Sequence, residues 1–257
     1  MRITRLLAVL VLVVPVLGSV DALEAGPIVY IGLDPGNGHF QPEASPLMAN
    51  AARFAGGSVD PAIGYLEAGA GFGSGTVGPK LVSEGFTNLT LLTSASLAII
   101  DLTVYDVLYF GPTTSSTTIA DYVAASAAIL AYVNGSGGLV VEPNVFDASS
   151  WSWVPDAAAI GHSGATNVGD NTVTIVDPGH PVMQGLTSAG LSGWNSSIHS
   201  TFSTPAAAGY SVLAVGGTGT AAIIVKGGLV VPEPSSFALL GLGALGLIAY
   251  RRKRRAA

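Results

Sequence analysis

The sequence predicts an α/β domain built on a mostly parallel β-sheet, with helices on both faces of the sheet. The first observation is a strand–helix–strand pattern over residues 107–141, since parallel neighbours need a crossover, usually a helix. The second is a series of short, Val- and Ile-rich runs that end at Gly, Pro or Asn. The third is a composition with 49% hydrophobic residues and no Cys, which suits a packed core without disulfides or thiolate zinc sites.

The N-terminal part of this domain is expected to contain two strands and a helix. Residues 28–33 (IVYIGL) form an apolar run, and the turn-forming sequence DPGNG follows it, which predicts a buried strand. A helix is expected over 46–55, with Ser45 as its N-cap. Residues 56–78 are rich in Gly and predict a loop that contains one short strand at 63–66.

The clearest pattern is in the middle of the chain. Residues 107–110 (VLYF) predict a buried strand, and 118–133 predict a helix, because apolar residues recur every three to four positions. Asn134-Gly135 ends that helix, and 139–141 form the next strand. Further strands are expected at 172–176, 212–215 and 221–225, the last two as a hairpin.

The N-terminus has the features of a secretory signal peptide. Arg2 and Arg5 precede an unbroken apolar run at 6–17, and small residues follow it. Cleavage is expected after Ala22 or Ala25, so residues 1–25 are predicted to pass through the secretion translocon and be removed by signal peptidase. A buried strand or an uncleaved anchor is the alternative, but twelve apolar residues are short for a bilayer.

The C-terminus, residues 229–257, contains three signals in order. Pro232, Glu233 and Pro234 come first, and an apolar segment at 237–250 follows. Fourteen helical residues rise about 21 Å, less than the ~30 Å hydrocarbon core. The segment ends at a basic cluster, a membrane stop signal expected to stay cytoplasmic: Arg251, Arg252, Lys253, Arg254 and Arg255.

This order of signals resembles the PEP-CTERM sorting signal of Gram-negative bacteria. The resemblance implies recognition by an exosortase, a membrane transpeptidase-like protease that cuts near Pro232-Glu233-Pro234. It implies export across the inner membrane, transient or stable anchoring there, and a final location at the cell surface or outside the cell. Proteins of this kind typically belong to organisms that make biofilm, so extracellular polysaccharide is a candidate partner. A plain tail anchor is the alternative interpretation.

Residues 26–228 carry a second resemblance. The sequences YDVLYF and YVNGSGGLVV, followed by HPVMQGL at 180–186, resemble the class I glutamine amidotransferase-like superfamily, which implies a flavodoxin-like sheet. Amidotransferases place a Cys nucleophile after the strand that corresponds to 139–141. This chain has Glu142-Pro143-Asn144 there and no Cys anywhere, so glutamine hydrolysis by that mechanism is excluded.

Glu142 is the strongest candidate for a functional side chain. It follows a central strand, at the edge where ligands bind in open α/β sheets, and Asp34 is expected at the same edge. The two carboxylates could serve acid–base chemistry or hold a cation, or Glu142 could simply accept hydrogen bonds from loop backbone. His199 lies in a polar and aromatic stretch and could face a pocket, or it could have a turn or surface role, as expected for the other histidines. Trp151 and Trp153 could stack on sugars or belong to the core.

Composition excludes several functions. Between Gly26 and Val231 there are three basic residues (Arg53, Lys80 and Lys226) against 13 acidic ones, so no basic face is available for nucleic acid. No nucleotide-binding motif occurs, and we expect no cofactor. No metal site is expected either, because none of the four histidines has a ligand spacing such as H-x₃-H: His39, His162, His180 and His199.

These observations favour an exported cell-surface or matrix-associated protein with a non-catalytic central domain. The alternative is a carbohydrate-active hydrolase or a carbohydrate-binding domain that uses Glu142 and Asp34. A third interpretation, a stably anchored inner-membrane protein, differs only in whether the C-terminal segment is removed.

Overall fold

The computed structural model describes residues 25–37, 43–68, 76–113, 115–142, 151–164, 171–194 and 198–227. The expected signal peptide up to residue 24, the sorting motif at 232–234, the apolar segment at 237–250 and the basic cluster at 251–255 lie outside these residues. Within the described ranges, no single helix is long and apolar enough to cross a membrane.

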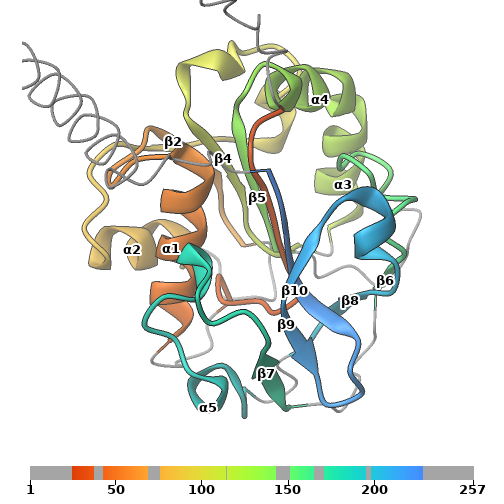
Figure 1. The fold of residues 1–257 in the computed structure, drawn as a ribbon. Helices are drawn as coiled ribbons and strands as arrows, with labels where there is room; N and C mark the ends of the chain where they lie inside the picture. Colours follow the sequence, from red (N-terminus) through yellow and green to blue (C-terminus); the bar gives the residue numbers. More distant parts are fainter. Residues whose placement is uncertain are drawn as a thin grey trace, which may run out of the picture.

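One large β-sheet forms the centre of the domain (Figure 1). Its hydrogen-bonded path is β3 (Leu89–Leu91), β2 (Ile63–Leu66), β4 (Val107–Phe110), β5 (Gly138–Val141), β1 (Ile28–Ile31), β10 (Ala221–Lys226), β8 (Ser200–Phe202) and β6 (His162–Gly164). Two further strands extend from β10: β9 (Ser211–Gly216) pairs with it, and β7 (Val173–Ile175) pairs with β9.

The sheet is mixed, so the prediction of a mostly parallel sheet was wrong. The strands from β3 to β1 are parallel, whereas every pair that involves β6 to β10 is antiparallel. A tight turn joins β9 to β10, and such a short connection can only make an antiparallel pair. The strand order also departs from a flavodoxin-like sheet, in which the first strand lies between the second and third. Here β1 lies between β5 and β10.

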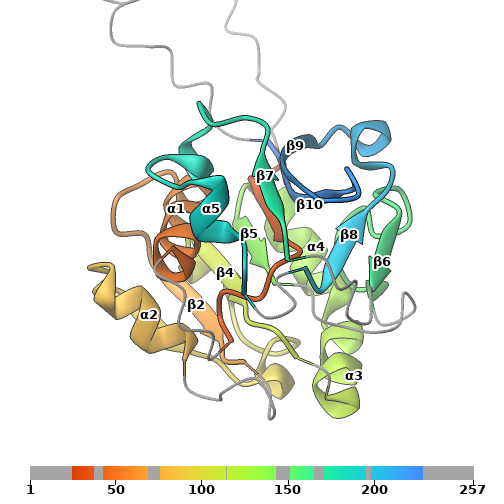
Figure 2. The ribbon, with the colours of Figure 1, turned by 90° about the horizontal axis from the view of Figure 1, so that it is seen from below.

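Helices cover both faces of the sheet, as the sequence predicts (Figure 2). On one face, α1 (Ala44–Gly56), α2 (Val77–Ser83) and α5 (Ser188–Leu191) pack in one hydrophobic core. On the other, α3 (Ser116–Ala124) and α4 (Ser126–Asn134) pack in a second core. Successive side chains of a strand point to opposite faces of the sheet, so neighbouring residues belong to different cores. Tyr109, for example, lies in the first core and Phe110 in the second. Short 3₁₀ helices complete the described fold: Ser94–Ser96, Leu102–Val104, Pro181–Met183 and Pro205–Ala208.

Some element boundaries differ from the prediction. The helix expected over 118–133 is two helices, bent by 55° at Ala125, although the sequence has no Pro or Gly there. The bend keeps Tyr122 and Ile129, one on each helix, in the same core. Helix α1 begins at Ala44 after Glu43, so Ser45 is in its first turn and is not the N-cap. Helices α2 and α5 and strands β3, β6 and β8 were not predicted.

Gly32 allows three strands to meet at the end of β1. A Cβ atom at this position would lie 2.1 Å from the carbonyl oxygen of Ser200 and 2.7 Å from that of Ala222. The backbone of Gly32 instead bonds to both neighbours: its N–H donates to Ala222, and its carbonyl accepts from Ser200. Only glycine fits this close approach, which directs the next residues, beginning with Leu33 and Asp34, to the edge of the sheet.

Candidate functional site: a buried polar cluster

The three side chains singled out from the sequence meet at one edge of the sheet. Asp34 follows β1 and Glu142 follows β5, and these strands are parallel neighbours, so their carboxyl ends lie together. His199 immediately precedes β8, and its backbone N–H donates to the carbonyl of Gly32 across 2.8 Å. The topology therefore brings Asp34, Glu142 and His199 together from positions up to 165 residues apart in the sequence.

Glu142 is buried, and each oxygen atom of its carboxyl group accepts a hydrogen bond. Its Oε2 accepts a hydrogen bond from the backbone N–H of Gly36 across 2.6 Å. Its Oε1 accepts one from the hydroxyl of Tyr109, on the adjacent strand β4, across 2.5 Å. Only 2% of the residue is exposed to solvent. The side chain therefore connects the ends of β5 and β4 to the loop after β1.

Asp34 is also buried and lies between two polar neighbours. Its Oδ2 accepts from the Asn37 side-chain amide across 2.7 Å, and its backbone carbonyl accepts from the Asn37 N–H, which closes a turn. Its Oδ1 lies 3.3 Å from Nε2 of His199. Asp34 is completely shielded from solvent, whereas the His199 side chain keeps 16% of its surface exposed. The carboxylate thus faces the protein's own groups, and the imidazole forms the outer boundary of the cluster.

Lys80 and Thr76 belong to the same cluster, although the sequence analysis did not select them. The ammonium group of Lys80, on α2, donates to the backbone carbonyls of Pro35 and Asn37, and the Thr76 hydroxyl donates to that of Gly36. The carboxylate of Glu67 positions α2 by accepting from the backbone N–H groups of Val77 and Gly78 at its first turn.

The sequence did contain a signal for Lys80. Lys80 is one of only three basic residues in the acidic central part of the chain, so its ammonium group is expected to lie near carboxylate or carbonyl oxygen atoms. Tyr109 was predicted only as part of an apolar strand, and nothing in the sequence indicates that its hydroxyl reaches a carboxyl group.

Burial dominates the electrostatics of the cluster. It raises the pKa of Glu142 to about 8, although the hydrogen bonds from Tyr109 and Gly36 and the charge of Lys80 act in the opposite direction. Burial also raises the pKa of Tyr109 well above its usual value, and the charge of Glu142 adds to that shift. It lowers the pKa of Lys80, against the attraction of Glu142 and Asp34. Glu142 is therefore mostly a neutral carboxylic acid at neutral pH.

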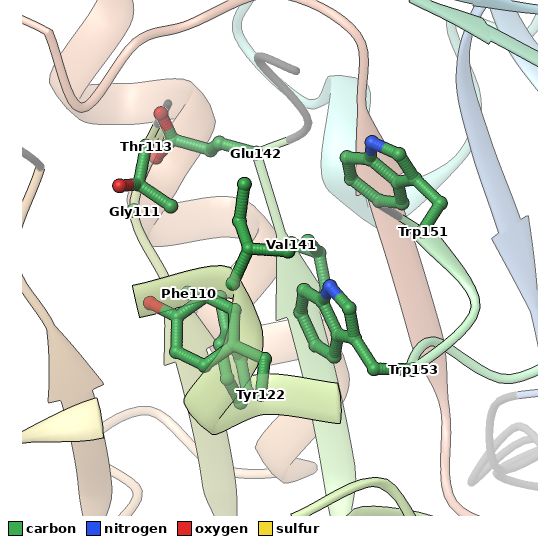
Figure 3. A pocket seen from close by; sticks show the side chains of 9 residues that line it. Phe110, Gly111, Thr113, Tyr122, Val141, Glu142, Trp151 and Trp153 are labelled. Carbon is green, nitrogen blue, oxygen red and sulfur yellow. The ribbon is translucent and has the colours of Figure 1, made fainter. Parts of the chain in front are cut away.

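The tryptophans that could have stacked on sugars lie in the second core instead. Trp151 and Trp153 are 2% and 4% exposed and pack against aromatic side chains, among them Phe110 and Tyr122. Figure 3 shows Val141 between their rings and the side chain of Glu142. The cavity that these residues line has a volume of about 10 Å³, the smallest space that can hold one water molecule. A sugar ring does not fit there.

Of the other histidines, His180 and His162 have local contacts away from the cluster, and His39 lies outside the described residues. His180 accepts a hydrogen bond from the Val182 N–H through Nδ1, which caps the 3₁₀ turn at 181–183. His162 stacks on Trp151 and lies 3.2 Å from the Ser200 hydroxyl, and burial lowers its pKa to about 4. Across the described ranges, no three His, Asp or Glu side chains are arranged to hold a metal ion.

A larger groove lies at the opposite end of the sheet, where the parallel strands begin. Its volume is about 420 Å³, which is in the range of ligand pockets. It is lined by the segments before β4 and β5, among them Tyr105, Asp106 and Gly137, and by the end of α1. The groove could not be predicted from the sequence, because its walls come from turns between elements and share no motif.

The fold is a mixed α/β domain, and the two carboxylates of the polar cluster at one edge of its sheet are shielded from solvent. The comparisons with known proteins concern the segment that follows this domain. Residues 230–255 match the PEP-CTERM protein-sorting motif. This motif marks the chain as an exported protein that an exosortase sorts and processes while it is anchored at the membrane, and that ends outside the cell. No curated protein and no solved structure matches the chain, and the resemblance to the amidotransferase-like superfamily has no support from them.

Proposed function

We propose that this protein is a cell-surface or matrix-associated protein whose central α/β domain is non-catalytic. In this proposal residues 1–25 are a signal peptide that signal peptidase removes, and residues 229–257 are the sorting segment, which the exosortase cuts near Pro232-Glu233-Pro234. The buried cluster around Glu142 holds the loop after β1 in place and performs no chemistry. The released domain, residues 26–228, is the functional product.

The observation that carries the non-catalytic assignment is the burial of both carboxylates. Glu142 and Asp34 are 2% and 0% exposed, and the groups around them come from the domain's own strands and loop. A glycosidase needs two carboxyl groups that flank a bound sugar, with space for the ring and, in inverting enzymes, for a water molecule. The contacts of Glu142 instead match those of a structural carboxyl group, which satisfies a backbone N–H and a buried hydroxyl.

The processing part of the proposal is tested by the intact mass of the mature protein from native cells, with and without the host exosortase. We expect a species that lacks both the first 22 or 25 residues and everything after the region of Pro232-Glu233-Pro234, and only in cells that contain the exosortase. Retention of residues 237–250 in both strains would make the protein a stably anchored membrane protein and would refute the proposal of release.

A second candidate function is favoured by the pKa of Glu142. A buried carboxyl group with a pKa of about 8, next to Asp34 and within reach of the charge of Lys80, resembles the perturbed acids of active sites. We keep a carbohydrate-active hydrolase or a carbohydrate-binding domain as this alternative, with Glu142 as the acid and Asp34 as its partner.

The Glu142→Gln variant separates the two functions. The mature protein and the variant are incubated with polysaccharide isolated from the host, and both hydrolysis and cosedimentation are measured. A hydrolase loses turnover in the variant while its circular dichroism spectrum is unchanged. A non-catalytic domain shows no hydrolysis in either protein, and the substitution changes only its stability.

A further inference from the structure

The N-terminal and C-terminal ends of the domain lie next to each other. β1 begins at Ile28 and β10 ends at Lys226, and these two residues are partners in an antiparallel pair. Gly227 lies against the backbone of Gly26 and Pro27, and the Gly26 N–H donates to the carbonyl of Val133 at the end of α4. Figure 1 shows the start of β1 (red) and the end of β10 (dark blue) side by side near α4. We call this end of the sheet, where the parallel strands begin, the tether end.

The exosortase motif is very close to the tether end along the chain. Pro232 is five residues after Gly227. A fully extended chain covers at most about 3.6 Å per residue, so the motif lies within about 18 Å of Gly227. That distance is smaller than the diameter of a small protein domain, about 30 Å. An enzyme that binds the motif in its active site therefore has to approach the tether end closely.

The tether end exposes apolar side chains to solvent. Among the described residues, the three most exposed large hydrophobic side chains are Ile99, Val59 and Val104, at 84%, 82% and 61%. Val59 lies between α1 and β2, and Ile99 and Val104 lie between β3 and β4, so all three are in segments that lead into the beginnings of parallel strands. The groove of about 420 Å³ opens at the same end, and Tyr105, the neighbour of Val104, lines it. These side chains offer a partner protein apolar surface to bury.

The charges at this end favour a protein partner over a lipid surface. Asp101 and Asp106 line the groove, and Asp60 follows Val59. Hydrogen bonds from Thr103 and Thr87 lower the pKa values of Asp101 and Asp60, so both carboxylates stay ionised. The cations at this end are Arg53, whose guanidinium bonds to the carbonyls of Val59 and Glu84, and Lys226, which forms an ion pair with Asp156. An anionic phospholipid surface would repel this excess of negative charge.

We infer that the tether end is the surface of this domain that contacts the exosortase during processing, with Ile99, Val104 and Val59 as the apolar contacts. The inference rests on exosortase processing, which the sorting motif indicates. The covalent connection keeps the two partners together, so even a weak contact is occupied at the high effective concentration that a short linker provides. The edge with Glu142 lies at the opposite end of the strands and points away from the enzyme.

Site-specific crosslinking in native cells tests this contact. A photo-crosslinking amino acid is placed at Ile99 or Val104 of the full chain and, as a matched control, at Leu91. Leu91 is a good control because it is 59% exposed, close to the 61% of Val104, but lies on edge strand β3, in register with Tyr65 of β2 and Tyr109 of β4, and does not line the groove. The cells contain an inactive exosortase variant, which keeps the uncut precursor bound.

We expect an adduct between the precursor and the exosortase from Ile99 and Val104, at least several-fold stronger than from Leu91. Equal adducts from all three positions, or none from Ile99 and Val104, would refute the contact. Adducts with lipid alone would show that this end lies on the bilayer, which also refutes it. If the intact mass shows that the exosortase does not shorten the chain at all, the proposed function itself fails, so the two failures are distinguishable.

A processing assay provides an independent measurement. In a pulse–chase experiment, Ile99→Glu with Val104→Glu should slow conversion of the precursor several-fold, whereas Leu91→Glu should leave it unchanged. These side chains are exposed, so the substitutions leave the folded core intact. Unchanged conversion in the double variant would contradict a productive contact at this surface.

Discussion

The carboxyl group of Glu142 accepts a hydrogen bond from the backbone N–H of Gly36, 106 residues away in the sequence, across 2.6 Å. This bond connects the end of the central strand β5 to the loop after β1. Lys80 and Thr76 bond to carbonyls of the same loop, so residues 35–37 are fixed from three directions. The arrangement leads to three predictions about stability, and a fourth concerns two buried tryptophans.

Gly36→Ala should lower the free energy of unfolding by about 1–3 kcal/mol, a typical cost of overpacking. An added Cβ would lie 2.7 Å from Oε2 and 2.8 Å from Oε1 of Glu142, so the carboxyl group would have to move away from the N–H that it binds. Gly179→Ala is the matched control, since the nearest atom to its Cβ would be 3.7 Å away. Urea unfolding of the mature protein measures both, and equal stability of the two variants would contradict the tight contact.

At pH 4.5, Glu142→Ala should destabilise the domain by about 2–4 kcal/mol, because it leaves the Gly36 N–H and the Tyr109 hydroxyl without their acceptor and opens a cavity. At the same pH, Glu142→Gln should cost much less, since its amide oxygen can accept from Gly36 and its NH₂ group can donate to the Tyr109 oxygen. Thermal unfolding of both variants checks this order. A Gln variant as unstable as the Ala variant would show that the amide does not replace these contacts.

The contribution of Glu142 to stability should fall as the pH rises from about 4.5 to about 8. The lowered pKa of buried His162 acts in the opposite direction up to about pH 6.5, so the total stability should fall clearly between about pH 6.5 and 8. The pKa of Glu142 is 4.5 as an ordinary side chain and about 8 in the folded domain, so in this interval the folded state holds a proton that the unfolded state has lost. Its contribution is complete below pH 4.5 and is lost as the pH approaches 8, at up to about 1.4 kcal/mol per pH unit.

Glu142→Gln removes this dependence, because an amide does not titrate. The variant should match the natural protein near pH 4.5 and exceed its stability near pH 8. Urea unfolding between pH 4.5 and 8 measures the difference. Parallel stability profiles for the two proteins would mean that burial does not raise the pKa of Glu142.

Trp194→Phe should be more destabilising than Trp153→Phe, by about 1 kcal/mol. Both indole rings are buried, but Nε1 of Trp194 donates to the carbonyl of Gly190 across 2.9 Å, whereas Nε1 of Trp153 has no acceptor among the described residues. Each substitution removes a similar volume, so the difference isolates the N–H group. Equal losses of stability in thermal unfolding would indicate that a buried water molecule already accepts from Trp153.

Part of the fold was predictable because it depends on local sequence. The strands at 63–66 and 107–110, the strand over 139–141 and the hairpin of β9 and β10 are confirmed, since apolar runs closed by Gly, Pro or Asn determine them without reference to distant residues. The break at Ala125 was not predictable, because no helix-breaking residue marks it and the helices bend to follow the core.

The part of the candidate site that consists of residues directly after strands was predictable from the sequence. Asp34 and Glu142 were placed at one edge because residues that follow parallel strands share an edge, and the structure brings them together with His199. The contribution of Lys80 and the hydroxyl of Tyr109 could not be found in this way, because both reach the cluster from elements whose packing is set by the whole core.

The sequence by itself determined that the protein is exported and sorted, because the sorting motif is read as a linear segment and needs no fold. It also determined the strands and the carboxylates that follow them, since these depend on neighbouring residues. Only the tertiary structure decided that β10 pairs antiparallel with β1, that Glu142 is buried against Gly36, and that Trp151 and Trp153 belong to the core. The strand pair and the burial of Glu142 depend on contacts between residues more than 100 positions apart, and Trp153 packs on Phe110 and Tyr122, 43 and 31 positions away. Local patterns do not encode such contacts.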